Sequence, residues 1–283
     1  MEKFNALLEL VRPRNMVISF LGVIVGMLLV STDITLDMRA IAAAASAMLI
    51  LGGGNALNDY YDLDADKINR PKRPIPSGRI TRGTAKLSSI LLFLAGLLIA
   101  LLINIYCLLL AALNSLVLAA YARYSKKAFL VSNLAVSYLS ASVFIYGAIS
   151  IYQTMRFNPL GLGTLAILIV SSFFMTLSRE IIKDVEDVKG DKKIDGITLP
   201  TEVGIQKSRE IAITVGVTSM VVSLIPIFIK ISSFNRTAYA LFITAANLIF
   251  ILSYLKEPGK SQKLLVLGMA TSLIAFLAGR LTV

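Results

Sequence analysis

Six aspartates in this 283-residue chain form two groups with the same spacing. The first group is Asp59, Asp62 and Asp66, and the second is Asp184, Asp187 and Asp191. Both follow the positions i, i+3 and i+7, which at about 100° per residue lie on one face of a helix. Like charges stacked in this way repel one another, so a bound cation would stabilise the face. Oxygen ligands suit Mg²⁺, which commonly joins carboxylates to the phosphates of a substrate.

The residues next to the two groups support the same interpretation. Asn55 and Glu180 occupy matching positions, four residues before each group. Asp64 and Glu186 point away from the two faces, so we expect them to be solvated. A single group could be the polar start of a loop with an aspartate as its cap. Two groups with identical spacing favour metal ions held on either side of a diphosphate.

Basic residues follow the first group closely along the chain. Three prolines within six residues exclude a helix there and stiffen the segment. We expect Lys67, Arg70 and Arg73 to bind phosphate, because arginine can donate two hydrogen bonds to it and lysine adds a point charge. Arg12 and Arg14 precede the first apolar run. They could reach the site, but we favour their interpretation as anchors at the membrane surface.

Two further basic segments complete the candidate substrate-binding residues. The segment 123–127 follows Tyr121 and contributes Lys126 and Lys127. Lys183 lies directly before the second aspartate group. These cations are expected at the same membrane surface as the aspartates.

The composition limits the chemistry that these residues can perform. The chain has no histidine and a single cysteine, Cys107, so zinc bound by histidine, Ser-His-Asp catalysis and an intramolecular disulfide are excluded. Hydrophobic residues make up 56% of the chain and charged residues 16%. Ordinary soluble domains have about 45–50% and about 25%. An ordinary soluble enzyme and a disordered chain are therefore also excluded.

Charge-free apolar runs long enough to cross a bilayer recur along the chain. They are 15–32, 40–58, 87–122, 128–155, 157–178, 210–229, 237–255 and 264–279. The run 87–122 is too long for one span and carries polar Asn104 and Tyr106 near its middle, so we expect two helices with a turn there. This predicts nine transmembrane helices, because a helix satisfies its own backbone hydrogen bonds in hydrocarbon. The predicted fold class is an all-α, polytopic membrane protein with one domain over residues 1–283.

Basic residues are distributed unequally between the two predicted membrane surfaces. Loops on the side of the N-terminus carry 23 Lys and Arg, and the opposite side carries 5. The positive-inside rule then predicts a cytoplasmic N-terminus. We expect a protein of the cell membrane, with membrane lipid and not nucleic acid as its surroundings. Its active site would face the cytoplasm in the charged loops 59–86 and 179–209.

The two motifs resemble those of the UbiA superfamily of intramembrane prenyltransferases. The resemblance lies in Asn58-Asp59-x-x-Asp62-x-x-x-Asp66 and Asp184-x-x-Asp187-x-x-x-Asp191, and the nine-helix pattern extends it over the chain. It implies one helical bundle around a central cavity that binds an isoprenyl diphosphate through Mg²⁺. Asn58 and the six aspartates would be the diphosphate–Mg²⁺ residues. Tyr121 and Lys126 would correspond to the Tyr/Lys pair of the superfamily, with a spacing one residue longer than usual.

Within the superfamily, residues 69–78 and Thr198-Leu199-Pro200 look most like archaeal digeranylgeranylglyceryl phosphate synthases. Those enzymes transfer a geranylgeranyl group from its diphosphate to the free hydroxyl of geranylgeranylglyceryl phosphate. The number of cations exceeds what one diphosphate needs, which favours an acceptor that carries phosphate. The alternatives are an aromatic or chlorin acceptor, such as 4-hydroxybenzoate or chlorophyllide, and, outside the superfamily, a CDP-alcohol phosphotransferase or a small transporter. The transporter is disfavoured because the spans carry no charge at their centres.

Overall fold

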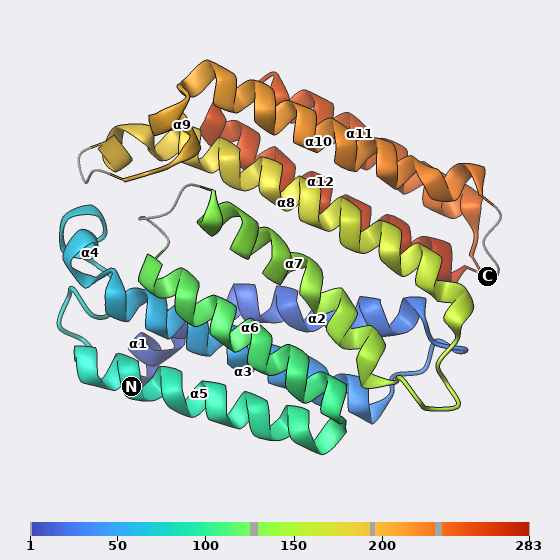
Figure 1. Cartoon of the computed structure of the whole chain (residues 1–283), viewed down its shortest axis with the longest axis horizontal. Helices are drawn as coiled ribbons and strands as arrows, with labels where there is room; N and C mark the ends of the chain where they lie inside the picture. The colour runs from blue at the N-terminus through green and yellow to red at the C-terminus, as the bar shows by residue number, and fades with distance from the viewer. Residues whose placement is uncertain (1, 125–129, 193–195, 230–233, 283) are drawn as a thin grey trace. The chain divides into compact units, whose positions relative to one another are not determined.

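The computed structural model describes residues 2–124, 130–192, 196–229 and 234–282, and most of these residues are helical (Figure 1). The helices are α1 (Glu2–Val11), α2 (Pro13–Leu29), α3 (Met38–Tyr61), α4 (Leu63–Asn69), α5 (Arg82–Ile103), α6 (Ile105–Tyr124), α7 (Val131–Ser150), α8 (Leu162–Asp191), α9 (Leu199–Glu202), α10 (Ile205–Phe228), α11 (Arg236–Tyr254) and α12 (Pro258–Leu281). A 3₁₀ turn, Pro159–Gly161, leads into α8. The predicted all-α class is confirmed.

Eight of the described helices are long and apolar enough to cross a membrane. They are α3, α5, α6, α7, α8, α10, α11 and α12. A ninth span results if α1 and α2, which are bent by 46° at their junction, count as one. The predicted turn inside the run 87–122 is confirmed, since α5 ends at Ile103 and α6 begins at Ile105. Asn104 joins the two helices, and its side-chain oxygen accepts a hydrogen bond from the backbone N–H of Cys107 at 2.8 Å.

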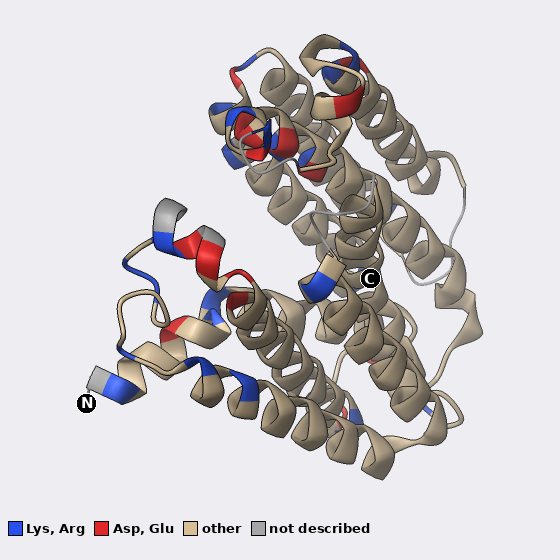
Figure 2. Cartoon of the chain, turned by 60° about the vertical axis from the view of Figure 1, so that its left-hand side comes forward, with Lys and Arg blue, Asp and Glu red and all other residues tan. Residues whose placement is uncertain are grey.

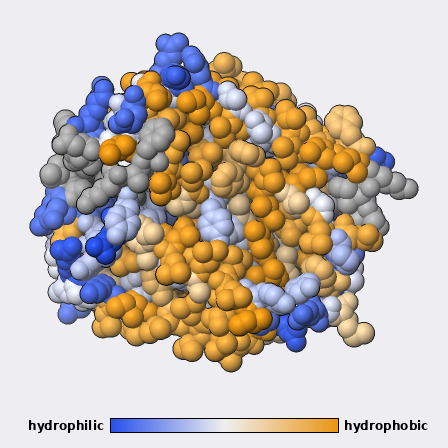
Figure 3. Space-filling view, in the orientation of Figure 1, coloured by the Kyte–Doolittle hydropathy of each residue, from blue (hydrophilic) through white to orange (hydrophobic). Residues whose placement is uncertain are grey.

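The flanks of these helices expose large apolar side chains over much of their length (Figure 3). Along α5 and α6, for example, the exposed residues include Leu91, Leu98, Leu102, Leu109 and Leu116. Charged residues instead gather near helix ends (Figure 2). A soluble monomer rarely exposes apolar patches of this extent, so lipid is the medium that suits these flanks.

The helices group into two compact units. The first unit comprises α1, most of α2, α3 to α6 and the end of α7. In it, small residues let α3 approach its neighbours closely: a side chain at Gly54 would collide with Leu118 of α6, and one at Gly96 of α5 with Ile50. Ser46 of α3 strengthens the contact by donating a hydrogen bond to the carbonyl oxygen of Gly96 at 2.7 Å. Close packing of small residues with polar links is typical of membrane helices.

The second unit comprises most of α7, α8 to α12 and the short segment Leu28–Ile34. In it, α8 packs against α10 and α12. Ser178 of α8 donates a hydrogen bond to the carbonyl oxygen of Ala212 at 2.7 Å, and Ser219 of α10 donates one to that of Ser171 at 2.7 Å. These links fix α8, which carries the second aspartate group at its C-terminal end. One domain over residues 1–283 stays a prediction.

Candidate active site

The first aspartate group lies at a break between two helices. Helix α3 ends at Tyr61, Asp62 is its C-cap, and α4 begins at Leu63. The prediction of one continuous helical face is therefore wrong for this group. Aspartate favours such positions because its side chain competes for hydrogen bonds with the helix backbone. Asp62 accepts a hydrogen bond from the Asn58 amide at 2.8 Å, so it is held apart from the other two aspartates.

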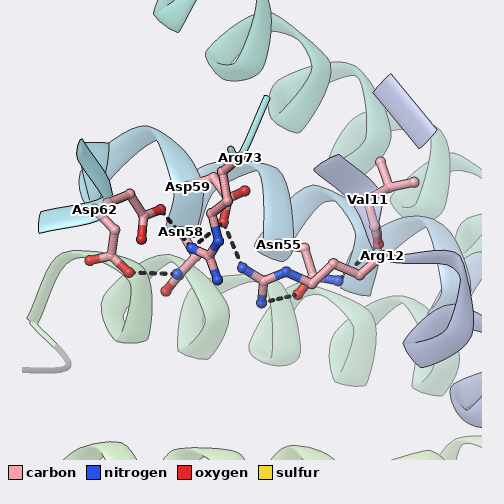
Figure 4. Close-up of polar contacts among 8 residues, drawn as sticks. Val11, Arg12, Asn55, Asn58, Asp59, Asp62 and Arg73 are labelled. Carbon is pink, nitrogen blue, oxygen red and sulfur yellow. Dashed lines mark hydrogen bonds and ion pairs between the residues drawn. The ribbon is translucent and has the colours of Figure 1, made fainter. Parts of the chain in front are cut away.

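Arg73 joins the two remaining aspartates of the first group. Its Nη1 donates a hydrogen bond to Asp66 Oδ2 at 2.6 Å and lies 3.3 Å from Asp59 Oδ1 (Figure 4). The side chains of Asp59 and Asp66 are only 4% and 8% exposed. One positively charged nitrogen therefore lies between two buried carboxylates, in a position that suits a cation.

Arg12 also reaches Asp59, from the junction of α1 and α2. Its Nη2 donates a hydrogen bond to Asp59 Oδ1 at 2.6 Å, and its Nη1 donates one to Asn55 Oδ1 at 3.4 Å. The interpretation of Arg12 as a lipid anchor is therefore corrected: its guanidinium contacts the aspartate group. Arg14, in contrast, is exposed. The sequence favoured the anchor role for Arg12 over a place in the site because 47 residues separate it from Asp59, although the proline that follows it signals a break in the helix.

The other cations predicted near the first group are placed differently. Lys67 pairs with Asp64 at 3.1 Å, and both side chains are largely exposed. Arg70 is exposed, and Tyr121 is half-buried on α6. Lys126 and Lys127 lie outside the described residues. Of the predicted phosphate-binding cations that the structure describes near this group, it is Arg73 that contacts the aspartates.

The second aspartate group keeps the predicted helical face. Helix α8 runs without interruption from Leu162 to Asp191, so Asp184, Asp187 and Asp191 follow one another along it. Asp187 is exposed, whereas Asp184 and Asp191 are half-buried. Asp184 Oδ2 accepts a hydrogen bond from the Nδ2 of Asn133 at 2.7 Å. Asn133 lies near the start of α7 and is itself buried, with 3% exposure.

Asn133 was not predicted from the sequence as a site residue. It precedes Asp184 by 51 residues, and one asparagine near the start of an apolar run carries no signal of its own. Only the hydrogen bond that it donates from α7 to Asp184 of α8 reveals its role.

Glu180 forms a second cluster of charges on α8. Its carboxylate accepts hydrogen bonds from Arg179 at 2.6 Å and from Lys183 at 3.0 Å, and its side chain is 8% exposed. The predicted binding residues Glu180 and Lys183 are thus in contact with each other. Arg179 was not predicted, and its Nε is buried without a hydrogen-bond partner among the described residues. A buried, unsatisfied donor of this kind is uncommon in folded proteins and is consistent with a role in binding an acidic ligand.

The residues of the first group fit a divalent cation in donor chemistry. Among the described residues, no three Asp, Glu or Cys side chains converge into a preformed metal cluster. The position between Asp59 and Asp66 nevertheless already holds the positive charge of Arg73. Carboxylate oxygens are the ligands that Mg²⁺ prefers, so Mg²⁺ could replace the guanidinium there. The hypothesis that both groups bind one diphosphate stays a prediction.

Apolar helices long enough to span a membrane, with carboxylates and cations at their ends, define a class of integral membrane proteins with a charged site at the membrane surface. The chain belongs to the UbiA prenyltransferase family, which it matches over residues 19–278, and it is a prenyltransferase.

Known relatives resemble the chain over nearly its whole length. A digeranylgeranylglyceryl phosphate synthase of Methanothrix thermoacetophila is 39% identical over 278 residues, covering 96% of this chain and 98% of that one. A solved structure of a digeranylgeranylglyceryl phosphate synthase is 32% identical, with a TM-score of 0.82 and full coverage of both chains. A UbiA homologue of Archaeoglobus fulgidus, solved with DMAPP and Mg²⁺, has a TM-score of 0.72 over 98% of this chain and 99% of that one. At 17% identity, this last likeness concerns the fold alone.

Proposed function

We propose that the chain transfers a geranylgeranyl group from its diphosphate to the free hydroxyl of geranylgeranylglyceryl phosphate. The product would be digeranylgeranylglyceryl phosphate, and the pathway would be archaeal ether-lipid synthesis. The observation that carries this proposal is the end-to-end similarity to synthases of this name, at 39% identity over 96% of the chain. The structural likeness to such a synthase, over the full length of both chains, supports it.

The six aspartates are the proposed Mg²⁺ ligands, with Asn58 beside them. Two observations support a metal: the cation position between Asp59 and Asp66, and the Mg²⁺ in the homologue from Archaeoglobus fulgidus. When bound, Mg²⁺ would neutralise charge that develops on the departing diphosphate. The proposed diphosphate-binding and substrate-binding residues are Asn55, Lys67, Arg70, Arg73, Tyr121, Lys126, Lys127, Glu180 and Lys183.

The proposed reaction begins with ionisation of the bond between the prenyl carbon and the diphosphate oxygen. Arg73 would donate hydrogen bonds to the leaving oxygens, and stabilising such charge is often the largest catalytic contribution. Apolar side chains of the helices would keep water from the allylic cation. The acceptor hydroxyl then forms the new bond to carbon. Its proton passes to a carboxylate of either aspartate group or to the departing diphosphate.

We further propose that residues 1–283 act as one catalytic domain with its site at the cytoplasmic surface. The excess of basic residues in the loops on the side of the N-terminus, 23 against 5, supports this orientation. Cysteine labelling from either side of sealed membranes tests it, with a cysteine introduced at Lys72 and the native Cys107 replaced by Ala. Labelling at position 72 from the outside would contradict it.

Parallel assays with two acceptors test which one the protein uses. Purified protein in detergent receives Mg²⁺, geranylgeranyl diphosphate and either geranylgeranylglyceryl phosphate or 4-hydroxybenzoate. We expect consumption of the lipid phosphate and loss of turnover with excess EDTA. Consumption of 4-hydroxybenzoate instead would favour the aromatic alternative.

A further inference from the structure

The junction of α1 and α2 has an unusual backbone. Arg12 lies between Val11, the last residue of α1, and Pro13, the first residue of α2, and it has φ = 56°. Proline disfavours helical geometry in the residue before it, so the break itself follows from the sequence. A positive φ is uncommon for a residue with a Cβ, and such conformations concentrate at functional sites.

Two hydrogen bonds of Asn55 hold this junction against α3. The amide Nδ2 of Asn55 donates a hydrogen bond to the carbonyl oxygen of Val11 at 2.9 Å, while its Oδ1 accepts one from Arg12. Asn55 thus holds both the main chain and the guanidinium of the junction (Figure 4). The bond from Arg12 to Asn55 does not involve Asp59, so it can persist when Asp59 changes partner.

The segment that carries Arg73 is fixed to the same region. Ala6 and Leu10 of α1 share a small hydrophobic core with Ile75 and Ile80, which flank the end of the proline-rich segment. An ion pair between Arg79 and Glu9, at 2.7 Å, adds a second link between them. The elements that carry Arg12 and Arg73 are therefore packed on one core, and both guanidinium groups meet at Asp59.

We propose that Arg12 is a further binding residue for the leaving diphosphate, and this inference rests on the proposed function. Asp59 cannot give the same oxygen fully to a metal ion and to two arginines. If a metal ion took that oxygen, Arg12 would lose its partner at Asp59 but would stay in place through Asn55. Its freed N–H group would then be available beside Asp59 to donate to an oxygen of the diphosphate. A guanidinium suits this role because its donors match phosphate oxygens.

If Arg12 moves from Asp59 to the diphosphate, its substitution should have opposite effects on the affinity for Mg²⁺ alone and on the affinity for pyrophosphate. A purely structural role predicts no such opposite effects. In Arg12→Gln, Asp59 loses a competing cation, so affinity for Mg²⁺ alone should rise by about two- to tenfold. Affinity for pyrophosphate in saturating Mg²⁺ should fall about tenfold or more, because a charged donor is lost. Arg12→Lys keeps the charge and should retain more pyrophosphate affinity than Arg12→Gln. Arg14→Gln, an exposed control two residues away, should change either affinity by less than about twofold.

Isothermal titration of the full chain in detergent measures both affinities, and thermal unfolding without ligand reports on folding. Weaker binding of both ligands by Arg12→Gln and Arg12→Lys alike, with a lowered unfolding temperature, would assign Arg12 a structural role and overturn the inference. Unchanged pyrophosphate affinity in Arg12→Gln would also overturn it while leaving the proposed function intact. If the wild-type chain bound no pyrophosphate with Mg²⁺, the proposed function would fail, and the inference with it.

Discussion

The two aspartate groups share a spacing but differ in what their carboxylates contact. In the first group, Asp59 and Asp66 are ion-paired with arginines that come from elsewhere in the chain. In the second, Asp184 accepts a hydrogen bond from the neutral amide of Asn133. A metal ion at the first group must therefore displace an ion-paired arginine, whereas the hydrogen-bond partner of Asp184 is neutral. Two motifs with identical spacing therefore differ in the charge of the groups that contact their carboxylates before a metal binds.

The comparison extends to the backbone. Helix α8 continues through all three aspartates of its group, whereas α3 ends before Asp62. The break turns Asp62 toward Asn58 and lets Asp59 and Asp66 meet at Arg73. The first group therefore depends on contacts from outside its helices, and the second depends mainly on one helix and its neighbour.

The largest expected effect comes from removing one carboxylate of either group. Asp59→Asn and Asp184→Asn should each reduce turnover by about 10²-fold or more, because each removes a proposed carboxylate ligand of the Mg²⁺ that would stabilise the leaving diphosphate. Turnover of geranylgeranyl diphosphate in detergent with Mg²⁺ measures this, with circular dichroism to check folding. Near-normal activity of either folded variant would show that only one group is catalytic, which would break the comparison.

Without substrate, the loss of Mg²⁺ affinity on removing one carboxylate should be larger for the second group than for the first. Asp184→Asn should lower the affinity for Mg²⁺ about tenfold, since its carboxylate binds without displacing an arginine. Asp59→Asn should lower it less, because the wild-type carboxylate is already paired with Arg12 and Arg73. Titration of the two variants with Mg²⁺ alone gives the order. The reverse order would mean that the arginines do not compete with the metal.

Asn133 offers a smaller and more local test of the second group. Asn133→Ala removes the hydrogen bond to Asp184, and a lost positioning bond of this kind should lower kcat about tenfold or less. Ser140→Ala is the matched control, since it removes a different link between α7 and α8, a 3.1 Å hydrogen bond from Thr176. Equal losses of kcat in both variants would point to helix packing and not to the orientation of Asp184.

Some of this architecture could be predicted from the sequence, because it depends on local pattern. The apolar runs predicted the all-α membrane class, and polar Asn104 predicted the turn between α5 and α6. The spacing of the aspartates indicated the two groups. A run of apolar residues must be helical in lipid, whatever its neighbours are. This is why the spans could be predicted from local sequence.

The contacts of Arg12 and Asn133 with the aspartates could not be predicted, because these two residues come from distant parts of the chain. Arg12 and Asn133 lie 47 and 51 residues from the carboxylates they contact. Nothing in their own neighbourhoods distinguishes a site residue from an anchor or a helix start. Asp62 shows a further limit: the 3.6-residue period places it on one face with Asp59, but its hydrogen bond to Asn58 and the break in the helix separate them.

The smallest expected effect concerns Lys67, which the sequence placed among the phosphate-binding residues. Its partner in the structure is Asp64, three residues before it, and the two side chains are 59% and 88% exposed. An exposed ion pair contributes little to stability, so Lys67→Gln and Asp64→Asn should both leave the unfolding temperature nearly unchanged. If Lys67 leaves Asp64 to bind the diphosphate, as proposed, Lys67→Gln should raise the KM for geranylgeranyl diphosphate by about two- to threefold, because one exposed cation contributes little. Asp64→Asn should not raise it. An unchanged KM in Lys67→Gln would remove Lys67 from the diphosphate-binding residues and leave it a surface ion pair.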